Sequence, residues 1–429
     1  MRKVALIVVL LLVTATAAQA QLLGTSVMPQ EGGAFTGGMG VAVIDNQTYF
    51  AIHLQPELAF GKFGVGLDVN LLYNTSTGHI RSKDWDESYD YLRLIRYVRY
   101  AHKGNPFYVR VGALDAARLG HGFLVNYYSN SPSYDDRKIG IALDVDFGAY
   151  GFESFANNVA RAEVLGGRVY WRPLRSTIGL PIIKNFELGA TYVTDIDPDD
   201  NRKTDDGVSA FGLDAGLPLI NGSVVRSMLY YDYGKIVDYG SGQAAGIGLD
   251  FRFPGGLAML SARFERRWLG KEFEPNFFNA FYEVDRYTKS EYGRGVRKVD
   301  LLPTITEETK GYFGELYGRV LGVIQVVGNF VRLDDVKHSG VLHLAADAPD
   351  AVPQIAAHAT YDKAAIETLE DVLTLDDRSV ARVGLGYKIK PYLILYVDYI
   401  WNFTYNERTQ RYEPQERIEP RLSFVYRFK

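Results

Sequence analysis

The chain has 429 residues, with 47 lysine and arginine side chains against 51 aspartate and glutamate, so its formal net charge at pH 7 is −4. This mildly acidic balance gives no reason to expect a nucleic-acid partner. The chain contains no cysteine, which excludes disulfide bonds, thiolate metal sites, a cysteine nucleophile and a lipidated cysteine.

The first twenty residues predict a secretory signal peptide. Basic residues at positions 2 and 3 precede an apolar run over 4–13, and an Ala-x-Ala site ends at Ala20. This order is typical of exported chains, so we expect cleavage between Ala20 and Gln21. A retained anchor is the alternative, but the apolar run is shorter than the ~20 residues that a spanning helix needs. No apolar run of 18 residues follows, so the exported chain is expected to be either periplasmic or a β-barrel.

After a glycine-rich segment over 21–40, which we interpret as a periplasmic lead-in, apolar and polar residues alternate repeatedly. Successive side chains of a strand point to opposite faces, so each run predicts a strand with one apolar face. The clear runs are 65–73, 107–112, 139–147, 211–217, 245–253, 257–268, 381–389, 393–403 and 422–428. Further strands are predicted at 41–44, 49–60, 89–102, 151–156, 160–171, 186–195, 223–233, 312–320 and 322–333.

The connections alternate in length. Short turns are predicted at Gly61, Gly104, Gly148, Pro254 and Pro391, and long polar loops at 74–88, 115–136, 196–206, 269–310, 334–377 and 404–416. Within the 334–377 loop, apolar residues at helical spacing predict a short helix over 363–373, outside the wall. Short periplasmic turns and long extracellular loops are typical of outer-membrane barrels.

These elements predict an all-β, transmembrane, antiparallel up-and-down β-barrel over 41–429. An open sheet edge would leave backbone groups unpaired in hydrocarbon, so the sheet must close. The strand number is expected to be even. We count 16 strands without the weak first hairpin and 18 with it, and we expect 16 within a range of 14–18.

The leader, the cysteine-free body, the alternating strands and the ending Leu422-x-Phe424-x-Tyr426-x-Phe428 together resemble bacterial outer-membrane β-barrel proteins of the porin or transporter type. No single named family is matched, and Lys429 follows the final aromatic residue where the class typically ends on it. The resemblance implies a place in the outer membrane of a Gram-negative envelope, with lipid around the barrel. It also implies that the barrel-assembly machinery reads the last strand.

Charged residues fall on the parity opposite the apolar faces, so we expect them to line the lumen: Asp68, Arg93, Arg99, Arg110, Asp144, Asp146, Asp214, Asp250, Arg252, Arg263, Arg382, Lys388, Arg421 and Arg427. Rings of charge select solutes in pores. The alternative is that these charges pair with one another and fix the strand register.

Aromatic residues of the last strands are candidates for the membrane girdle: Tyr399, Trp401, Phe403, Phe424, Tyr426 and Phe428.

The histidines predict neither a metal site nor an enzyme. All seven are scattered, and no HExxH motif occurs. A barrel-rim hydrolase would have to use His121 with Asp115, or His79 with Asp84 and Asp86, and closeness in sequence does not establish that geometry. The glycines around His121 suit a loop turn, or a lid over the pore.

Six aspartates cluster in one predicted loop, at positions 195, 197, 199, 200, 205 and 206. They suggest calcium, but the full ligand-and-glycine spacing of a known calcium loop is missing. We therefore expect a solvated charged loop, and no metal or other cofactor.

The function predicted from these features is a porin-like channel or uptake protein for small polar or anionic solutes. The alternative is a non-transporting scaffold or adhesin that acts through the long loops 269–310 and 334–377. We expect no enzymatic activity.

Overall fold

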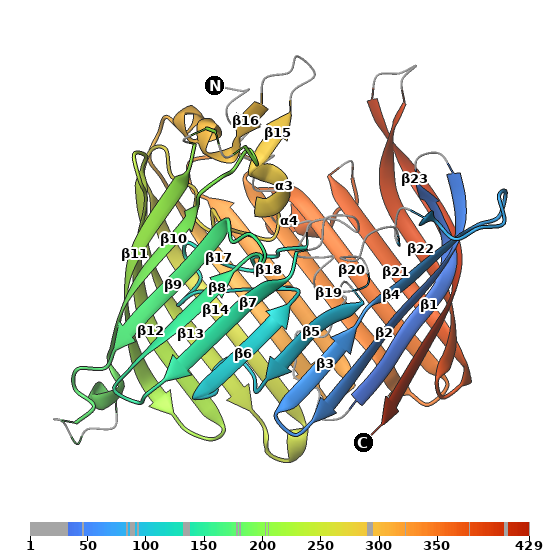
Figure 1. The fold of residues 1–429 in the computed structure, drawn as a ribbon, viewed down its shortest axis with the longest axis horizontal. Coiled ribbons are helices and arrows are strands. Elements are labelled where there is room, and N and C mark those ends of the chain that lie inside the picture. The colour runs from blue at the N-terminus through green and yellow to red at the C-terminus, as the bar shows by residue number, and fades with distance from the viewer. Residues whose placement is uncertain are drawn as a thin grey trace.

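The computed structural model describes residues 33–428, apart from 45–46, 83–84, 86–90, 92–93, 132–137, 177–178, 180–181, 202, 205, 290–294, 322, 377 and 407–410. Within this part, antiparallel strands form a wide, tilted ring, with the C-terminus at the end that carries most of the short turns (Figure 1). No helix in the described part combines the length and apolar character needed to span a bilayer. The predicted signal peptide lies outside the described residues.

The strands in the first half of the chain are β1 (Gly33–Ile44), β2 (Gln47–Phe60), β3 (Phe63–Leu67), β4 (Val69–Asn74), β5 (Ile95–Tyr100), β6 (Phe107–Gly112), β7 (Gly140–Asp146), β8 (Tyr150–Ala156), β9 (Val164–Trp171), β10 (Glu187–Asp195), β11 (Val208–Asn221) and β12 (Val225–Ile236). Those in the second half are β13 (Ser241–Arg252), β14 (Ala258–Leu269), β15 (Tyr287–Lys289), β16 (Gly295–Arg297), β17 (Thr309–Val320), β18 (Ile324–Leu333), β19 (Gly340–Val352), β20 (Ile355–Ile366), β21 (Ser379–Lys390), β22 (Leu393–Asn406) and β23 (Arg411–Phe428). Short helices are η2 (Ile183–Asn185), η3 (Pro254–Gly256), α3 (Tyr282–Asp285), η4 (Lys298–Thr304) and α4 (Leu369–Leu373).

The strand pairings close on themselves. β1 pairs with β2 on one edge and with β23 on the other, where Gly33 lies opposite Phe428 and Met39 opposite Leu422. β3 and β4 both pair with β2 and are separated only by Asp68, so they act as one interrupted strand. β15 and β16 form a separate small sheet. The ring therefore has twenty strand positions, all paired antiparallel.

The predicted all-β antiparallel barrel is confirmed, but the expected count of 16 strands is wrong. The segment 334–377, predicted to be a long loop, contains the wall strands β19 and β20. Alanines, aspartates and a proline interrupt the rows of large apolar residues in this segment, and those rows are the signal by which a strand is recognised. With the first hairpin also present in full, these two strands bring the ring to twenty.

Three boundaries also differ from expectation. β1 begins at Gly33, within the segment over 21–40 that was interpreted as a lead-in. Residues 363–366 belong to β20, so the predicted helix over 363–373 is reduced to α4. The predicted long loop over 404–416 is largely strand, because β22 extends to Asn406 and β23 begins at Arg411.

The two faces of the wall differ as the alternation predicts. On β21, Val383, Leu385 and Tyr387 are exposed, whereas the intervening Gly384 and Gly386 are buried. On β12, Leu229 and Tyr231 are exposed, whereas Tyr230 and Asp232 are buried. The exposed rows form the apolar outer face, and the charged and small residues face the interior of the ring.

Candidate functional site

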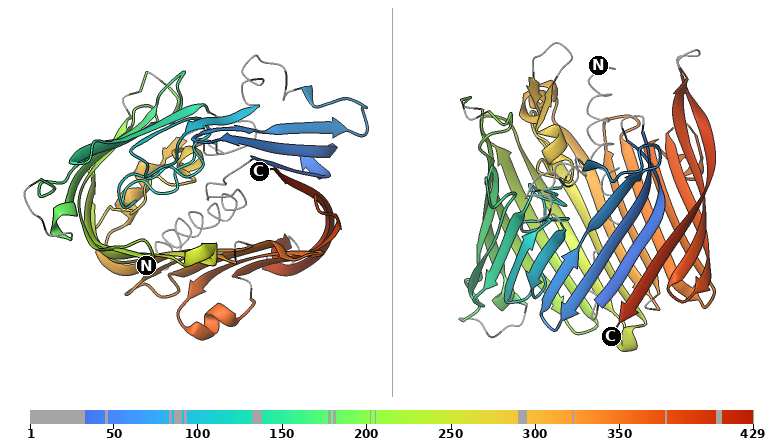
Figure 2. Two further views of the ribbon diagram at one scale, coloured as in Figure 1. Left: turned by 90° about the horizontal axis from the view of Figure 1, so that it is seen from below. Right: turned by 45° about the vertical axis from the view of Figure 1, so that its right-hand side comes forward.

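Two loops from the long-loop end fold into the ring. We call residues 113–131 inner loop 1, and residues 270–289 and 295–308 inner loop 2. Inner loop 1 connects β6 towards β7, and inner loop 2 belongs to the β14–β17 connection. Seen along the ring in Figure 2, both lie within its outline, against the wall made by β7 to β14, while β15 and β16 of inner loop 2 rise beyond the strand ends in Figure 1. Because these loops lie against the inner face of the wall, the candidate functional site is the interior of the ring.

The inner loops are joined to each other by backbone hydrogen bonds. Val125 and Phe278 form a parallel bridge. The backbone N–H of Asn126 donates to Phe278 O at 3.2 Å, and the N–H of Phe278 donates to Leu124 O at 3.1 Å. Because these residues are about 150 positions apart, the two loops form one substructure only in the folded barrel.

Aromatic side chains fill the space between the inner loops and the wall. Phe277 and Phe278 are fully buried, and Tyr128, Tyr282 and Phe273 are at most 2% exposed. This cluster is the main apolar core among the described residues. The apolar residues of the wall face outward, so the inner loops supply a core that the wall alone lacks.

Glycines on the inner face of the wall make room for these loops. A Cβ atom added at Gly234 of β12 would lie 2.8 Å from Leu124 Cδ2, and one added at Gly242 of β13 would lie 2.5 Å from Phe273. Cβ atoms do not approach other atoms so closely, so the absence of a side chain at these two positions permits the close contact.

A buried asparagine fixes the base of inner loop 1. Asn130 Oδ1 accepts a hydrogen bond from the backbone N–H of Leu114 at 2.8 Å. Its Nδ2 donates to the carbonyls of Gly112, Lys138 and Asn157 at 3.3, 3.0 and 2.9 Å. With its polar atoms satisfied, this fully buried side chain connects strands β6, β7 and β8 to the loop.

The inner wall carries a network of ion pairs within and between nearby strands. Arg168 of β9 binds Asp214 and Glu187 at 2.6 and 2.7 Å. On the other side of inner loop 1, Arg263 of β14 binds Glu315 of β17 at 2.7 Å. Arg267 binds Glu265 at 2.6 Å on the same strand.

Inner loop 1 inserts its own polar groups into this network. Arg118 lies 3.2 Å from Glu315, and the backbone N–H of Gly120 donates to Glu153 at 2.9 Å. His121 lies 3.0 Å from Asp232 and its carbonyl accepts from Arg263. The Gly-His-Gly segment is therefore a turn that docks its histidine on the wall.

Eight of the predicted lumen residues make ion pairs. They are Asp68 with His53, Arg99 with Glu57, Arg110 with Asp115, Asp144 with Lys103, Asp146 with Arg172, Asp214 with Arg168, Arg263 with Glu315, and Arg382 with Asp398. Arg99 and Arg110 lie directly opposite each other on β5 and β6, and each has a carboxylate that offsets the like charge. Pairing of this kind agrees with a role in fixing strand register, which was the alternative to solute selection.

The remaining predicted residues are not brought together. Asp250 and Arg252 of β13 make no ion pair with a described residue, and Lys388 Nζ donates to Val352 O at 3.5 Å. Arg93 lies outside the described residues, as do the side chains of Arg421 and Arg427. Whether the whole predicted set lines an open lumen stays a prediction.

The girdle assignment also stays a prediction. Tyr399 of β22 is 39% exposed and Trp401 is half-buried. Phe403, Phe424, Tyr426 and Phe428 lie on β22 and β23, and their side chains are outside the described part.

Sequence reasoning missed Arg168, Asp232, Glu265 and Glu315. A signal was present, because Arg168 lies directly opposite Glu153 and Arg263 directly opposite Glu315 in the sheet register. Opposite charges at such cross-strand positions attract. These cross-strand pairs can be recognised only when the register between neighbouring strands is known, and the alternation within a single strand does not give that register.

The residues proposed for a rim hydrolase do not assemble. Asp115 lies between Arg96 and Arg110, at 2.9 and 2.6 Å, while His121 pairs with Asp232 instead. Burial opposes the ionisation of Asp115, but the two guanidinium groups outweigh it and lower its pKa below the usual value. The partners suggested for His79 lie outside the described residues.

At the loop end, a second polar network holds inner loop 2. Arg286, just after α3, binds Asp195, Glu163 and Glu283 at 3.0, 2.8 and 3.3 Å. Lys138 adds a further contact to Glu283 at 2.8 Å. Through these groups α3 is fixed to the ends of β9 and β10.

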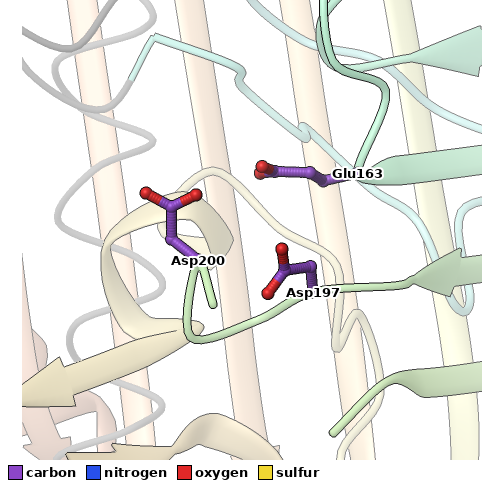
Figure 3. Close-up of side chains that lie close together, drawn as sticks. All are labelled: Glu163, Asp197 and Asp200. Carbon is purple, nitrogen blue, oxygen red and sulfur yellow. The ribbon is translucent and has the colours of Figure 1, made fainter. Parts of the chain in front are cut away.

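Three carboxylates of this region converge, as Figure 3 shows for Glu163, Asp197 and Asp200. The guanidinium of Arg161 binds all three, with Glu163 at 2.8 Å. A cationic side chain therefore already balances this group.

No protein-family model matches the chain, and no curated protein matches it. Similar solved structures include the outer membrane protein opdK from Pseudomonas aeruginosa, at 12% identity over 92% of this chain and 97% of that chain, with a TM-score of 0.35. Another is Wzi of Escherichia coli, an outer membrane protein involved in group 1 capsule assembly and described as a carbohydrate-binding β-barrel. It is 11% identical over 96% of this chain and 87% of that chain, with a TM-score of 0.40.

CdiB from Acinetobacter baumannii is 7% identical with a TM-score of 0.32. The match spans 93% of this chain but 61% of CdiB. The solved structures that resemble this chain include outer-membrane barrel proteins. The TM-scores of these matches are below 0.5, and we draw no argument about function from them.

Proposed function

We propose that the protein is an outer-membrane uptake barrel for small polar or anionic solutes, in which the two inner loops narrow the path through the ring. The observation that carries the proposal is the insertion of inner loop 1 into the inner charge network, through Arg118, Gly120 and His121. A loop anchored there occupies space that a solute would otherwise cross.

The number of strands in the ring supports an interior wide enough for water. Barrels of ~16–18 strands leave an aqueous channel, and those of ~22 strands hold a plug. A ring of twenty positions falls between these two cases. We infer that the inner loops act as a partial plug built from the wall's own connections.

A group of arginines on one part of the wall supports the preference for anions. Arg96, Arg99 and Arg110 lie on the neighbouring strands β5 and β6, where Asp115 and Glu57 are the carboxylates that contact them. Three guanidinium groups therefore gather on two adjacent strands, and cationic groups attract anionic solutes in pores.

The scaffold or adhesin alternative rests on the length of the segments 269–310 and 334–377. Phe273, Phe277, Phe278 and Tyr282 of the first segment are buried. The second segment largely forms the β19–β20 hairpin of the wall. These two features support the uptake barrel over the alternative, because less of either segment is free to act as an exposed loop.

Conductance of the purified barrel in planar lipid bilayers tests the proposal. We expect small discrete conductance steps with a preference for anions, and a several-fold larger conductance when residues 116–127 are replaced by a short Gly-Ser linker. A barrel that is folded and inserted, yet passes neither ions nor solutes in both forms, would overturn it. Folding is verified separately by the shift in gel mobility on heating.

A further inference from the structure

The loop between β10 and β11, residues 196–207, is held against inner loop 2. Arg286 donates to the carbonyl of Asp197, and Arg297 Nη1 donates to the carbonyl of Asp206 at 2.9 Å. Asp197 and Asp206 are 6% and 9% exposed. Two carboxylates of this loop are therefore buried at a junction between loops and are not solvated on a free surface.

Three carboxylates of the loop point to one place. One oxygen from each of Asp197, Asp199 and Asp206 lies within 4.8 Å of the other two. Oxygens that bind one calcium ion at ~2.3–2.6 Å lie at most about 5 Å apart. The spacing thus fits three ligands around a single hard cation.

Within this group, the carboxylate of Asp206 lacks a counter-charge among the described residues. Its Oδ1 atom is buried and has no hydrogen-bond partner among the described residues. A buried carboxylate oxygen without a partner is unfavourable.

The nearby cations are engaged elsewhere. Arg161 binds Asp197 together with Glu163 and Asp200, so it balances one carboxylate of the three and leaves Asp199 and Asp206 without a described cationic partner. The guanidinium of Arg297 binds the carboxylate of Asp300 at 2.6 Å, and it reaches Asp206 only at the backbone carbonyl. No described basic side chain therefore contacts the Asp206 carboxylate.

The backbone is already folded around these ligands. The N–H of Asn201 donates to Asp197 Oδ1 and to Asp199 Oδ1, at 2.8 and 2.9 Å. Asp197, Asp199 and Asn201 repeat the alternate spacing with which calcium loops begin. Position 202 is not the usual glycine, and Asp206 supplies a carboxylate from the far end of the loop instead.

We propose that Asp197, Asp199 and Asp206 bind one divalent cation of the calcium type. The bound ion fastens the 196–207 loop to inner loop 2, because the carbonyls of two of its ligand residues are held by Arg286 and Arg297. This site is independent of whether the barrel conducts.

Calorimetric titration of the detergent-solubilised, full mature barrel with calcium chloride, after treatment with EDTA, tests the proposal. We expect one saturable site with a Kd on the order of 10⁻⁴–10⁻³ M, as in extracellular calcium modules. Asp199→Asn and Asp206→Asn each weaken binding at least roughly tenfold. The matched control is Asp200→Asn, on the same loop but exposed and bound to Arg161, and it leaves the Kd within about twofold.

Thermal unfolding provides a second readout. With calcium absent, Asp206→Asn raises the unfolding temperature, because it removes the charge of a buried carboxylate. With saturating calcium it lowers the temperature relative to the wild type. The proposal is overturned if the folded wild type shows no saturable heat, if all three variants bind as the wild type does, or if calcium leaves the order of unfolding temperatures unchanged.

Discussion

His121 of inner loop 1 lies with its Nδ1 atom 3.0 Å from Asp232 Oδ1 on β12. The two residues are 111 positions apart, and both side chains are at most 9% exposed. The imidazole also stacks on Tyr230, with ring centroids 4.3 Å apart. This contact is the point at which the tip of the loop is fastened to the wall.

Replacing His121 with alanine is expected to release the loop tip, because it removes both the contact to Asp232 and the stacking on Tyr230. Leaving a buried Asp232 unpaired costs ~3–5 kcal/mol if the charge is retained, so the loop moves away or water enters. Single-channel recording should show a larger and noisier conductance. His79→Ala, an exposed histidine in another loop, should leave the trace unchanged, and equal traces for both variants would contradict the docking role.

Replacing Gly234 with leucine is expected to push Leu124 and Phe123 away from the wall. The glycine leaves no room for a side chain, and overpacking of this kind costs ~1–3 kcal/mol. Limited proteolysis should then cut within inner loop 1 faster than in the wild type. Gly248→Leu on the next strand is the control, since a Cβ atom there meets nothing within 4 Å. Similar cleavage of both variants would show that the close approach is not what holds the loop.

Asp115→Asn is expected to weaken the base of inner loop 1 in a pH-dependent way. Asp115 has a folded-state pKa below its unperturbed 3.8, so its ionised form stabilises the folded state. That contribution is fully present above pH ~4–5, and is lost as the pH falls through the lowered value. The side chain is a quarter exposed, so we expect about 2 kcal/mol at pH 7, less than the ~3–5 kcal/mol for a fully buried pair.

Denaturant unfolding in lipid vesicles at pH 7 and pH 3 measures this effect for Asp115. The difference in unfolding free energy between wild type and Asp115→Asn should shrink at the lower pH. A difference that stays constant across this range would mean that the carboxylate charge is not what Arg96 and Arg110 recognise.

Arg99→Gln is expected to reduce the preference for anions, because it removes one of the three guanidinium groups on β5 and β6. The reversal potential across a salt gradient should move towards that of a cation-selective pore. Arg266→Gln removes the same charge from the opposite parity of β14, where Arg266 pairs with Asp334 at the rim. If both substitutions move the reversal potential equally, the inner wall is not the selectivity element.

The sequence alone determined the class of fold. Rows such as Val383, Leu385 and Tyr387 alternate with small or charged residues. A period of two indicates β-strands with one apolar face, and strands that face lipid must close into a barrel. The strand number was not determined in the same way. β19 and β20 use alanine and aspartate where other strands use large apolar residues, so their pairing became evident only with neighbours on both sides.

Most contacts of the candidate site could not be predicted from the sequence. The predicted charges on β6, β7, β11 and β14 do form ion pairs, but the sequence did not identify Glu315, Arg168 and Asp115 as their partners. Whether inner loop 1 projects outward or folds inward depends on Leu124 meeting Phe278 and Gly234, which lie more than 100 residues away in the chain. Alternation within one strand reports which side chains share a face. Contacts between distant segments depend on register and ring closure, which only the tertiary structure supplies.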